Sequence, residues 1–237
     1  MEALSAAATK AQRRGKVAFP PSFVRAADDG GTPPLARMIQ GGRGGKVRLK
    51  LYLCITMLAT RAPYDLRQSS PTPQSWSRLL GLPPDTGPRQ VSSNLRWLKE
   101  QQFVSLEPRI GQPPAITLLN VTGDGSTYTD PRKARYVGVP IELWTQGWLL
   151  DLTATGLALL LVLLDALGGK DEPRYVTNYA RRSYGLSPDT WTRARKELEG
   201  HGLLTVGRTP QGSDYDYYRL RNTYWINKSR LNSPPER

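Results

Sequence analysis

Apolar residues in the last third of the chain recur with the period of a helix. Trp191, Ala194 and Leu198 are three and four positions apart and therefore share one face of a helix predicted over 187–199. Ser187 and the proline that follows it are typical of a helix start, because a hydroxyl N-cap is combined with proline at the first helical position. Glycines just after the helix are expected to end it.

The flanks of this helix extend the pattern. A short helix is expected within 176–186, upstream of a turn. Residues 203–206 and 215–220 are expected to form two strands, joined by a loop over 209–214 that contains glycine and proline. The pattern therefore predicts a helix, a turn, a second helix and a β-hairpin.

An earlier stretch repeats this pattern one hundred positions upstream. One stretch begins GLPPDT and the other GLSPDT, and the earlier one carries four additional residues in its turn. After that turn, Val91 and Leu98 correspond to Trp191 and Leu198, so both predicted helices keep an apolar inner face and a polar, partly basic outer face. The chain is therefore predicted to contain two copies of one supersecondary unit.

A longer apolar helix is expected before each copy, over 47–60 and around the Leu-rich run 157–164, with Thr153 as the N-cap of the second. The predicted fold class is mainly α with small β-wings (α+β). Residues rich in Ala, Gly, Pro and basic side chains predict disorder at the start of the chain, and a short polar stretch predicts a linker. The expected division is a disordered basic N-terminal arm over 1–45, a first domain over 46–121, a linker over 122–135, a second domain over 136–226 and a tail over 227–237.

Charge narrows the choice of partner. The chain has 33 Lys and Arg against 20 Asp and Glu, a net charge of +13 that favours a polyanion such as nucleic acid. The Leu-rich run is too short to span a bilayer, and the N-terminus lacks the apolar segment of a secretory signal. We therefore expect a cytoplasmic protein without a membrane partner.

Residue types also limit the chemistry. The chain has one cysteine, Cys54, and one histidine, His201, which excludes an intramolecular disulfide and leaves almost no material for a zinc site or a Ser/His/Asp triad. The GGRGGK segment lacks the spacing of a phosphate-binding loop. We expect no cofactor, no metal and no catalytic site.

The segments VPIELW and TNYARRSYGLSPDTWTRARKELEGHGLL, with the Leu-rich helix between them, resemble the winged helix-turn-helix domains of bacterial transcriptional regulators. They are also similar to the corresponding domains of phage and plasmid replication proteins. The resemblance covers residues 136–220, and residues 46–120 look like a degenerate companion with a longer turn. It implies two winged helix-turn-helix domains in tandem that bind double-stranded DNA.

The resemblance and the predicted outer faces together give the expected contact residues. In the second unit the helix over 187–199 would enter a major groove, with two basic and two hydroxyl side chains facing bases or phosphates. The first unit would present the matching face, and one arginine of each wing would touch the DNA backbone. The predicted DNA-binding residues are Arg89, Ser92, Ser93, Arg96, Arg109, Thr190, Thr192, Arg193, Lys196 and Arg208.

Other functions stay open at this point. Transcriptional regulation is preferred on frequency alone, and initiation of plasmid or phage replication is the alternative. Acidic residues on the same surfaces, Asp189, Asp214 and Asp216, favour a protein-interaction module instead, and a homodimer or another protein partner is left open. An enzyme is the weakest reading: Tyr215, Tyr217 and Tyr218 cluster near arginines, although alternating tyrosines are commoner at a strand edge.

Overall fold

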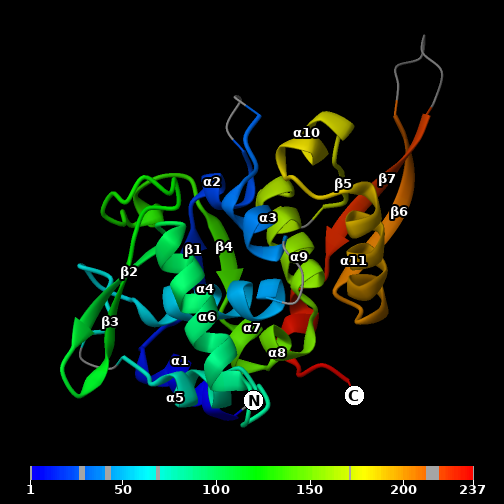
Figure 1. Ribbon diagram of the computed structural model, residues 1–237. Coiled ribbons are helices and arrows are strands. Elements are labelled where there is room, and N and C mark those ends of the chain that lie inside the picture. Colours follow the sequence, from blue (N-terminus) through cyan, green and yellow to red (C-terminus); the bar gives the residue numbers. More distant parts are fainter. Residues whose placement is uncertain are drawn as a thin grey trace.

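The computed structural model describes residues 2–26, 30–40, 44–67, 70–170, 172–211 and 219–236. It is a mixed α and β structure with small antiparallel sheets, in which two units repeat the same order of elements (Figure 1). Each unit has a long helix, a short helix, a second long helix and a hairpin. In the first unit these are α4 (Gly45–Leu58), α5 (Pro73–Leu79), α6 (Gly87–Glu100), β2 (Val104–Arg109) and β3 (Gln112–Leu118). In the second they are α9 (Ala154–Ala166), α10 (Asn178–Ser183), α11 (Pro188–Gly200), β6 (Leu204–Gln211) and β7 (Arg219–Ile226).

The predicted register of one hundred positions holds from α6 and α11 into the hairpins. Both helices end in a residue of left-handed conformation two positions after the last helical residue, at Gln102 (φ 57°) and Gly202 (φ 69°). The next residue, Phe103 in one unit and Leu203 in the other, is completely buried, and each hairpin starts one position later. The same chain reversal is therefore built twice, once with glycine and once with a strained glutamine.

A short additional strand completes each hairpin in the same way. In the second unit, β5 (Arg174–Tyr175) precedes α10 and pairs with β7, which gives the sheet order β5-β7-β6. In the first unit, an isolated antiparallel bridge between Asp65 and Thr117 stands in the corresponding place before α5. The predicted second strand over 215–220 is observed only from Arg219 onward, since residues 212–218, including Asp214, Asp216, Tyr215, Tyr217 and Tyr218, lie outside the described residues.

The prediction of a disordered arm over 1–45 is wrong for the described part of that segment. It forms α1 (Glu2–Lys10), β1 (Lys16–Phe19), α2 (Pro21–Val24) and α3 (Pro34–Ile39). Its few apolar side chains, among them Leu4, Phe23, Leu35 and Met38, are completely buried. Large apolar side chains are few in this segment, but nearly every one of those described faces the core, and average composition does not register that.

The expected linker and tail also belong to the body of the protein. β1 pairs antiparallel with β4 (Val137–Pro140), which follows the 3₁₀ helix η2 (Pro131–Lys133), so the N-terminal segment is joined to the second unit. Tyr128 of the expected linker is buried. At the C-terminus, η3 (Lys228–Asn232) buries Leu231, and the Trp148 indole N–H donates to the Leu231 carbonyl at 3.2 Å.

One continuous hydrophobic core therefore crosses the expected domain boundary. α4 and α9 pack against each other, and α3 packs against both. The two short helices α7 (Glu142–Thr145) and α8 (Trp148–Asp151) lead into α9, whose predicted N-cap is confirmed: the Thr153 hydroxyl accepts the Gly156 N–H at 3.1 Å. Among the described residues, none of the helices combines the length and the apolar character needed to cross a bilayer.

Candidate nucleic-acid interface

α11 has the two faces that its sequence predicts. Ser187 caps the helix, its hydroxyl oxygen accepting the Thr190 N–H at 3.2 Å, and Pro188 follows at the first helical position. The inner face is buried, with Trp191 3%, Ala194 0% and Leu198 0% exposed. The outer face is therefore set by the packing of these three residues rather than by the charges opposite them.

The outer face of α11 carries Asp189, Thr192, Arg193 and Lys196, all exposed, with Thr190 half-buried at the edge. The Thr192 hydroxyl donates to the Pro188 carbonyl at 2.9 Å, so its oxygen keeps lone pairs for an outside donor. Within the described part of the chain, neither Arg193 nor Lys196 forms an ion pair or a hydrogen bond. Their charges are available to a partner.

The start of α11 is anchored by an aromatic group that the sequence analysis did not identify. The Trp191 indole N–H donates to the Tyr224 hydroxyl at 3.3 Å, linking the helix to β7. The Arg181 guanidinium from α10 lies 4.7 Å above the Trp191 ring and donates to the same Tyr224 hydroxyl. Three elements of the second unit thus meet at one indole, which fixes the angle between the short helix and α11. The Arg181 guanidinium is engaged in these contacts, and Arg181 is not part of the outer face of α11.

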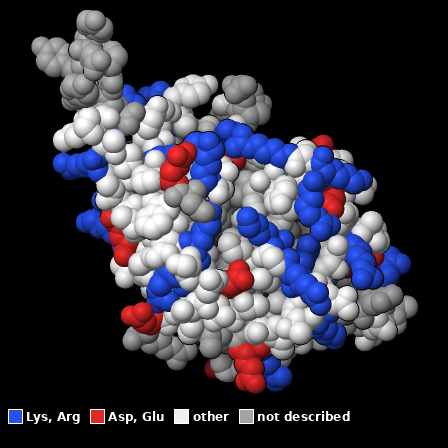
Figure 2. Space-filling model, turned by 180° about the vertical axis from the view of Figure 1, so that it is seen from behind, with Lys and Arg blue, Asp and Glu red and all other residues white. Residues whose placement is uncertain are grey.

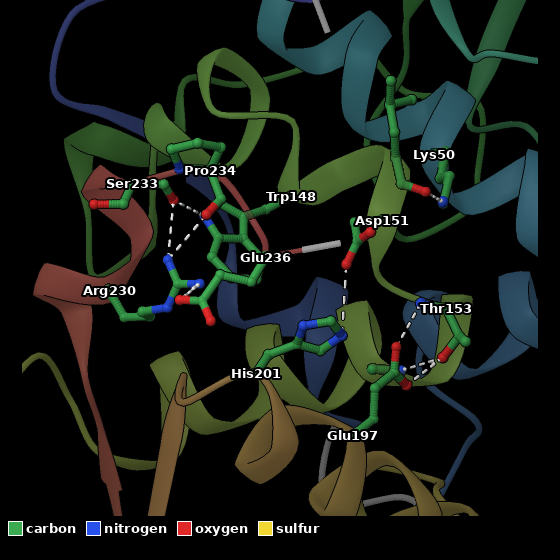
Figure 3. A network of polar contacts seen from close by, with 12 residues as sticks. Lys50, Trp148, Asp151, Thr153, Glu197, His201, Arg230, Ser233, Pro234 and Glu236 are labelled. Atoms are coloured by element: carbon green, nitrogen blue, oxygen red, sulfur yellow. Dashed lines mark hydrogen bonds and ion pairs between the residues drawn. The ribbon is translucent and has the colours of Figure 1, made fainter.

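The other end of α11 is tied to the start of α9 (Figure 3). Glu197 accepts the Thr153 backbone N–H at 2.7 Å and also the Thr153 hydroxyl. A carboxylate at this place is favourable because the N–H groups of the first turn of α9 point toward it. The His201 Nε2 lies 3.5 Å from an Asp151 carboxylate oxygen, and its ring meets Trp148 edge to face.

Figure 3 also shows Lys50, which joins this end of the second unit to the first. Its side chain leaves α4, and its ammonium group donates to the Leu150 carbonyl at 2.8 Å. Lys50 is 3% exposed, and burial, reinforced by the charge of Lys46, lowers its pKa to about 8. The bond from Lys50 to Leu150 fixes α4 relative to α8. Burying the charged ammonium group for this bond lowers the stability of the fold.

α6 presents a similar outer face in the first unit. Arg89, Ser92, Ser93 and Arg96 are all exposed, while Val91 and Leu98 are completely buried. The Ser92 hydroxyl donates to the Pro88 carbonyl at 3.0 Å, as its counterpart Thr192 does in α11. None of the described residues forms an ion pair with Arg89 or Arg96.

The starts of the two helices differ, although their sequences share the letters PDT. In α11 the shared proline, Pro188, is the first helical residue, whereas Pro84 lies in the turn before α6 and Pro88 takes the helical position. Thr86 stands as N-cap of α6 without a side-chain capping bond. The four additional residues therefore lengthen the turn, and the letter match at that point is not a structural match.

The two predicted wing arginines lie in different surroundings. Arg109 is bonded to backbone carbonyls: its guanidinium donates to Pro113 of the same hairpin at 2.8 Å and to Arg67, which precedes α5, at 2.6 Å. The tip next to it exposes Ile110 fully. Arg208 is exposed on β6. Of the two arginines, Arg208 is therefore exposed to solvent, whereas Arg109 stabilises the hairpin.

The predicted contact residues form two groups rather than one. α6 packs on α4, α4 on α9 and α9 on α11, so the two outer faces lie at opposite ends of a row of helices. Figure 2 shows that basic side chains also gather elsewhere, around a hollow on the face opposite to the view of Figure 1. The surplus of positive charge is therefore not confined to α6 and α11.

Groups suited to catalysis or metal binding do not gather in the described residues, where no cluster of three or more His, Cys, Asp and Glu side chains is found. Cys54 is completely buried, and burial raises the pKa of its thiol to about 12. A thiol in that state is a poor nucleophile.

No protein-family model, curated protein sequence or solved structure matches this chain.

Proposed function

We propose that this protein binds double-stranded DNA in a sequence-specific manner through two winged helix-turn-helix units in tandem. α11 is the main reading helix, and α6 is the second. Regulation of transcription is the role we favour, and initiation of plasmid or phage replication is the alternative. The same contacts serve either role, because both require recognition of a defined duplex site.

The observation that carries this proposal is the repeated outer face. Two helices in the same register each bury an apolar face against a long helix and leave basic and hydroxyl side chains exposed. Arginine, lysine and threonine in such a position are the usual partners of base edges and phosphates in a major groove. The order long helix, short strand, short helix, reading helix and hairpin supports the same assignment in both units.

The net charge of +13 supports a polyanionic partner. In α11 both basic residues of the outer face lack a partner within the described chain, whereas structural arginines such as Arg181 are already bonded. Asp189 at the start of α11 can accept a hydrogen bond from a cytosine amino group, so one acid on this face is compatible with DNA.

The test is a selection from random-sequence duplex DNA, followed by competition titrations of the enriched site at two salt concentrations. Arg193→Ala combined with Lys196→Ala is expected to weaken specific binding at least tenfold, since one good base contact contributes about 1–3 kcal/mol of discrimination. Arg89→Ala with Arg96→Ala tests α6 in the same way and is expected to relax a different part of the site.

A matched control removes the same charge elsewhere. Arg61 and Lys133 are exposed and lie on neither outer face, so replacing both with alanine lowers the net charge by the same two units. That control is expected to preserve the sequence preference. If selection enriches no site, or if the control loses specific binding as the α11 pair does, then the proposal is wrong. Binding partners would then be sought among proteins.

A further inference from the structure

The sheet of the second unit exposes aromatic side chains on the side that faces away from α11. This sheet has the order β5-β7-β6 and lies at one side of the molecule (Figure 1). Tyr224 of β7 faces α11, since its hydroxyl accepts the Trp191 indole N–H. Successive residues of a strand point to opposite faces, so Trp225 points away from the helix. This opposite side, the aromatic sheet face, exposes Tyr175, Thr205, Thr209, Arg221 and Trp225.

Two large rings lie close together on the aromatic sheet face. Tyr175 is 44% exposed and Trp225 is 39% exposed. Tyr175 is paired with Thr223, which lies two positions before Trp225 on β7. The two rings are therefore diagonal neighbours on one face, with their backbone positions about 7–8 Å apart. Each ring keeps a large part of its surface open to a flat partner.

The floor between these side chains is low. Gly207 of β6 lies opposite Thr223, and the pairing of β6 with β7 continues through it without a register shift. A glycine inside a regular strand often marks a place where a ligand or another backbone comes close. Thr223 is 5% exposed, and its hydroxyl oxygen lies 3.2 Å from that of Thr209, so its side chain does not project from the floor. A flat group can therefore approach the backbone beside the rings.

Arg221 gives the aromatic sheet face a positive charge. Its guanidinium carbon lies 5.6 Å from the centre of the Tyr175 ring, which holds the side chain over the sheet. Arg221 forms no ion pair with the described residues, and none of the side chains described on this face is acidic. Its charge is therefore available to an anionic group such as a phosphate.

The first unit builds the corresponding sheet face with different residues. In the register of one hundred positions, β2 and β3 pair as β6 and β7 do. Thr117 of β3 takes the place of Trp225, and Glu107 of β2 takes the place of Gly207. The fold of the hairpin therefore requires neither the exposed tryptophan nor the glycine.

The place of Tyr175 also differs between the units. Asp65 forms an antiparallel bridge with Thr117, and Arg67, two positions later, stands where Tyr175 stands in the second unit. Arg67 pairs with Glu107 across the sheet. The first unit thus covers this face with an ion pair, whereas the second leaves aromatic rings and an unpaired arginine on it.

We propose that the aromatic sheet face binds single-stranded DNA, with bases stacked on Tyr175 and Trp225 and a phosphate at Arg221. Exposed aromatic side chains beside basic ones on an open sheet suit unpaired bases, because every base has a flat face that can stack. A second copy of the chain fits less well, because it would bring another positively charged face against one without a described acid. The choice of DNA over RNA rests on the proposed function, but the stacking site is separate from α6 and α11.

The test compares two strands by fluorescence anisotropy with the full chain. One is an oligothymidylate of about twelve nucleotides, and the other is an abasic deoxyribose phosphate strand of the same length. Both carry the same backbone charge, so only contacts to the bases distinguish them. The oligothymidylate is expected to bind at least about fivefold more tightly. Trp225→Thr combined with Tyr175→Arg introduces the residues of the first unit and is expected to bring the two affinities within about twofold of each other.

Two controls match these changes. Tyr179→Ala removes a tyrosine that is 79% exposed on α10, outside the sheet, and is expected to preserve the preference for the oligothymidylate. Arg221→Gln is expected to weaken the binding of both strands more than Arg61→Gln does, since Arg61 is exposed but lies outside the sheet. Equal midpoints of urea unfolding exclude misfolding as the cause.

The proposal is overturned if the unchanged protein binds both strands equally, or if the double variant keeps the preference. It is also overturned if Tyr179→Ala loses the preference as fully as the double variant does. A double variant that converts a dimer into a monomer in sedimentation, with unchanged affinity for the oligothymidylate, would assign this face to contact between copies instead. Duplex recognition is tested separately, because Arg193→Ala with Lys196→Ala is expected to leave the preference for the oligothymidylate unchanged.

Discussion

Lys50 offers a direct test of how the two units are joined. Its ammonium group is bonded to the Leu150 carbonyl in a site that is almost fully buried, and its pKa falls from 10.5 to about 8. Replacing it with methionine keeps the length of the side chain and removes the charge. The variant therefore separates the electrostatic cost of Lys50 from its packing.

The size of the effect follows from the shift in pKa. A fall of this size corresponds to roughly 3 kcal/mol of lost stability while the group is charged in both the folded and the unfolded state, that is, below pH 8. Between pH 8 and 10.5 the unfolded chain binds more protons than the folded one, so stability rises with pH in that window. The contribution of Lys50 is thus expected to become less unfavourable by about 1 kcal/mol from pH 7 to pH 9.

Urea unfolding of the wild-type protein and of Lys50→Met at pH 7, 8 and 9 measures this change in stability. Lys50→Met is expected to be the more stable protein at pH 7, with a gain below 3 kcal/mol because the bond to Leu150 is lost. That gain is expected to shrink by about 1 kcal/mol at pH 9. Lys99→Met, on the exposed side of α6, is the control and should show no such trend. A difference that stays constant with pH would show that the Lys50 pKa is not lowered.

Two further changes probe the packing of α6 and α11. A Cβ at Gly87 would lie 2.0 Å from the Ser77 Oγ, so Gly87→Ala is expected to cost about 1–3 kcal/mol in urea unfolding, whereas Gly200→Ala, with open space around it, should be neutral or slightly stabilising. Glu197→Gln keeps an acceptor for Thr153 but removes the charge at the start of α9, and is expected to cost about 1 kcal/mol. An unchanged midpoint of Glu197→Gln in low salt would contradict this account of the α9 terminus.

The repeat could be predicted from the sequence because the buried residues of its two helices have the same spacing. Val91 and Leu98 have the same spacing as Trp191 and Leu198, and all four are buried. The change of chain direction after each of these helices also depends on adjacent residues only. It needs one residue in the left-handed conformation, followed directly by a buried one. Local patterns of this kind depend on neighbours a few positions apart, and a single sequence contains them.

What could not be predicted depends on distant partners. Phe23 follows two prolines and shows no helical or strand periodicity, yet it stacks on Phe19 and on Tyr52 of α4. Arg13, in the arm that is predicted to be disordered, donates to the carbonyls of Thr56, at 3.0 Å, and Met57, at 2.9 Å, at the end of α4. The composition of the segment indicates neither the aromatic stacking of Phe23 nor the hydrogen bonds of Arg13. For that reason the sequence predicts a disordered arm.

The partners of Asp165, a buried residue near the end of α9, could not be predicted for a similar reason. Arg25 and Arg135 approach its carboxylate at 3.9 and 3.2 Å, and the Tyr184 hydroxyl donates to it at 3.0 Å, so its partners come from three distant segments. A buried aspartate late in a Leu-rich helix was the available signal. A carboxylate in such a run must find donors from elsewhere in the chain, because burying it unpaired costs several kcal/mol.

If the two outer faces bind DNA as proposed, the shared core limits how they can do so. If 122–135 were a flexible linker, each unit could find its half of a DNA site independently, and the spacing of the two halves would be variable. Here β4 is paired to β1, α3 packs on both α4 and α9, and Lys50 bonds across to Leu150. Because these contacts hold α6 and α11 at one separation, a duplex read by both helices has to match that separation or bend to meet it. Changing the distance between the two halves of a selected site by half a helical turn is therefore expected to abolish joint binding, whereas flexibly tethered units would tolerate it.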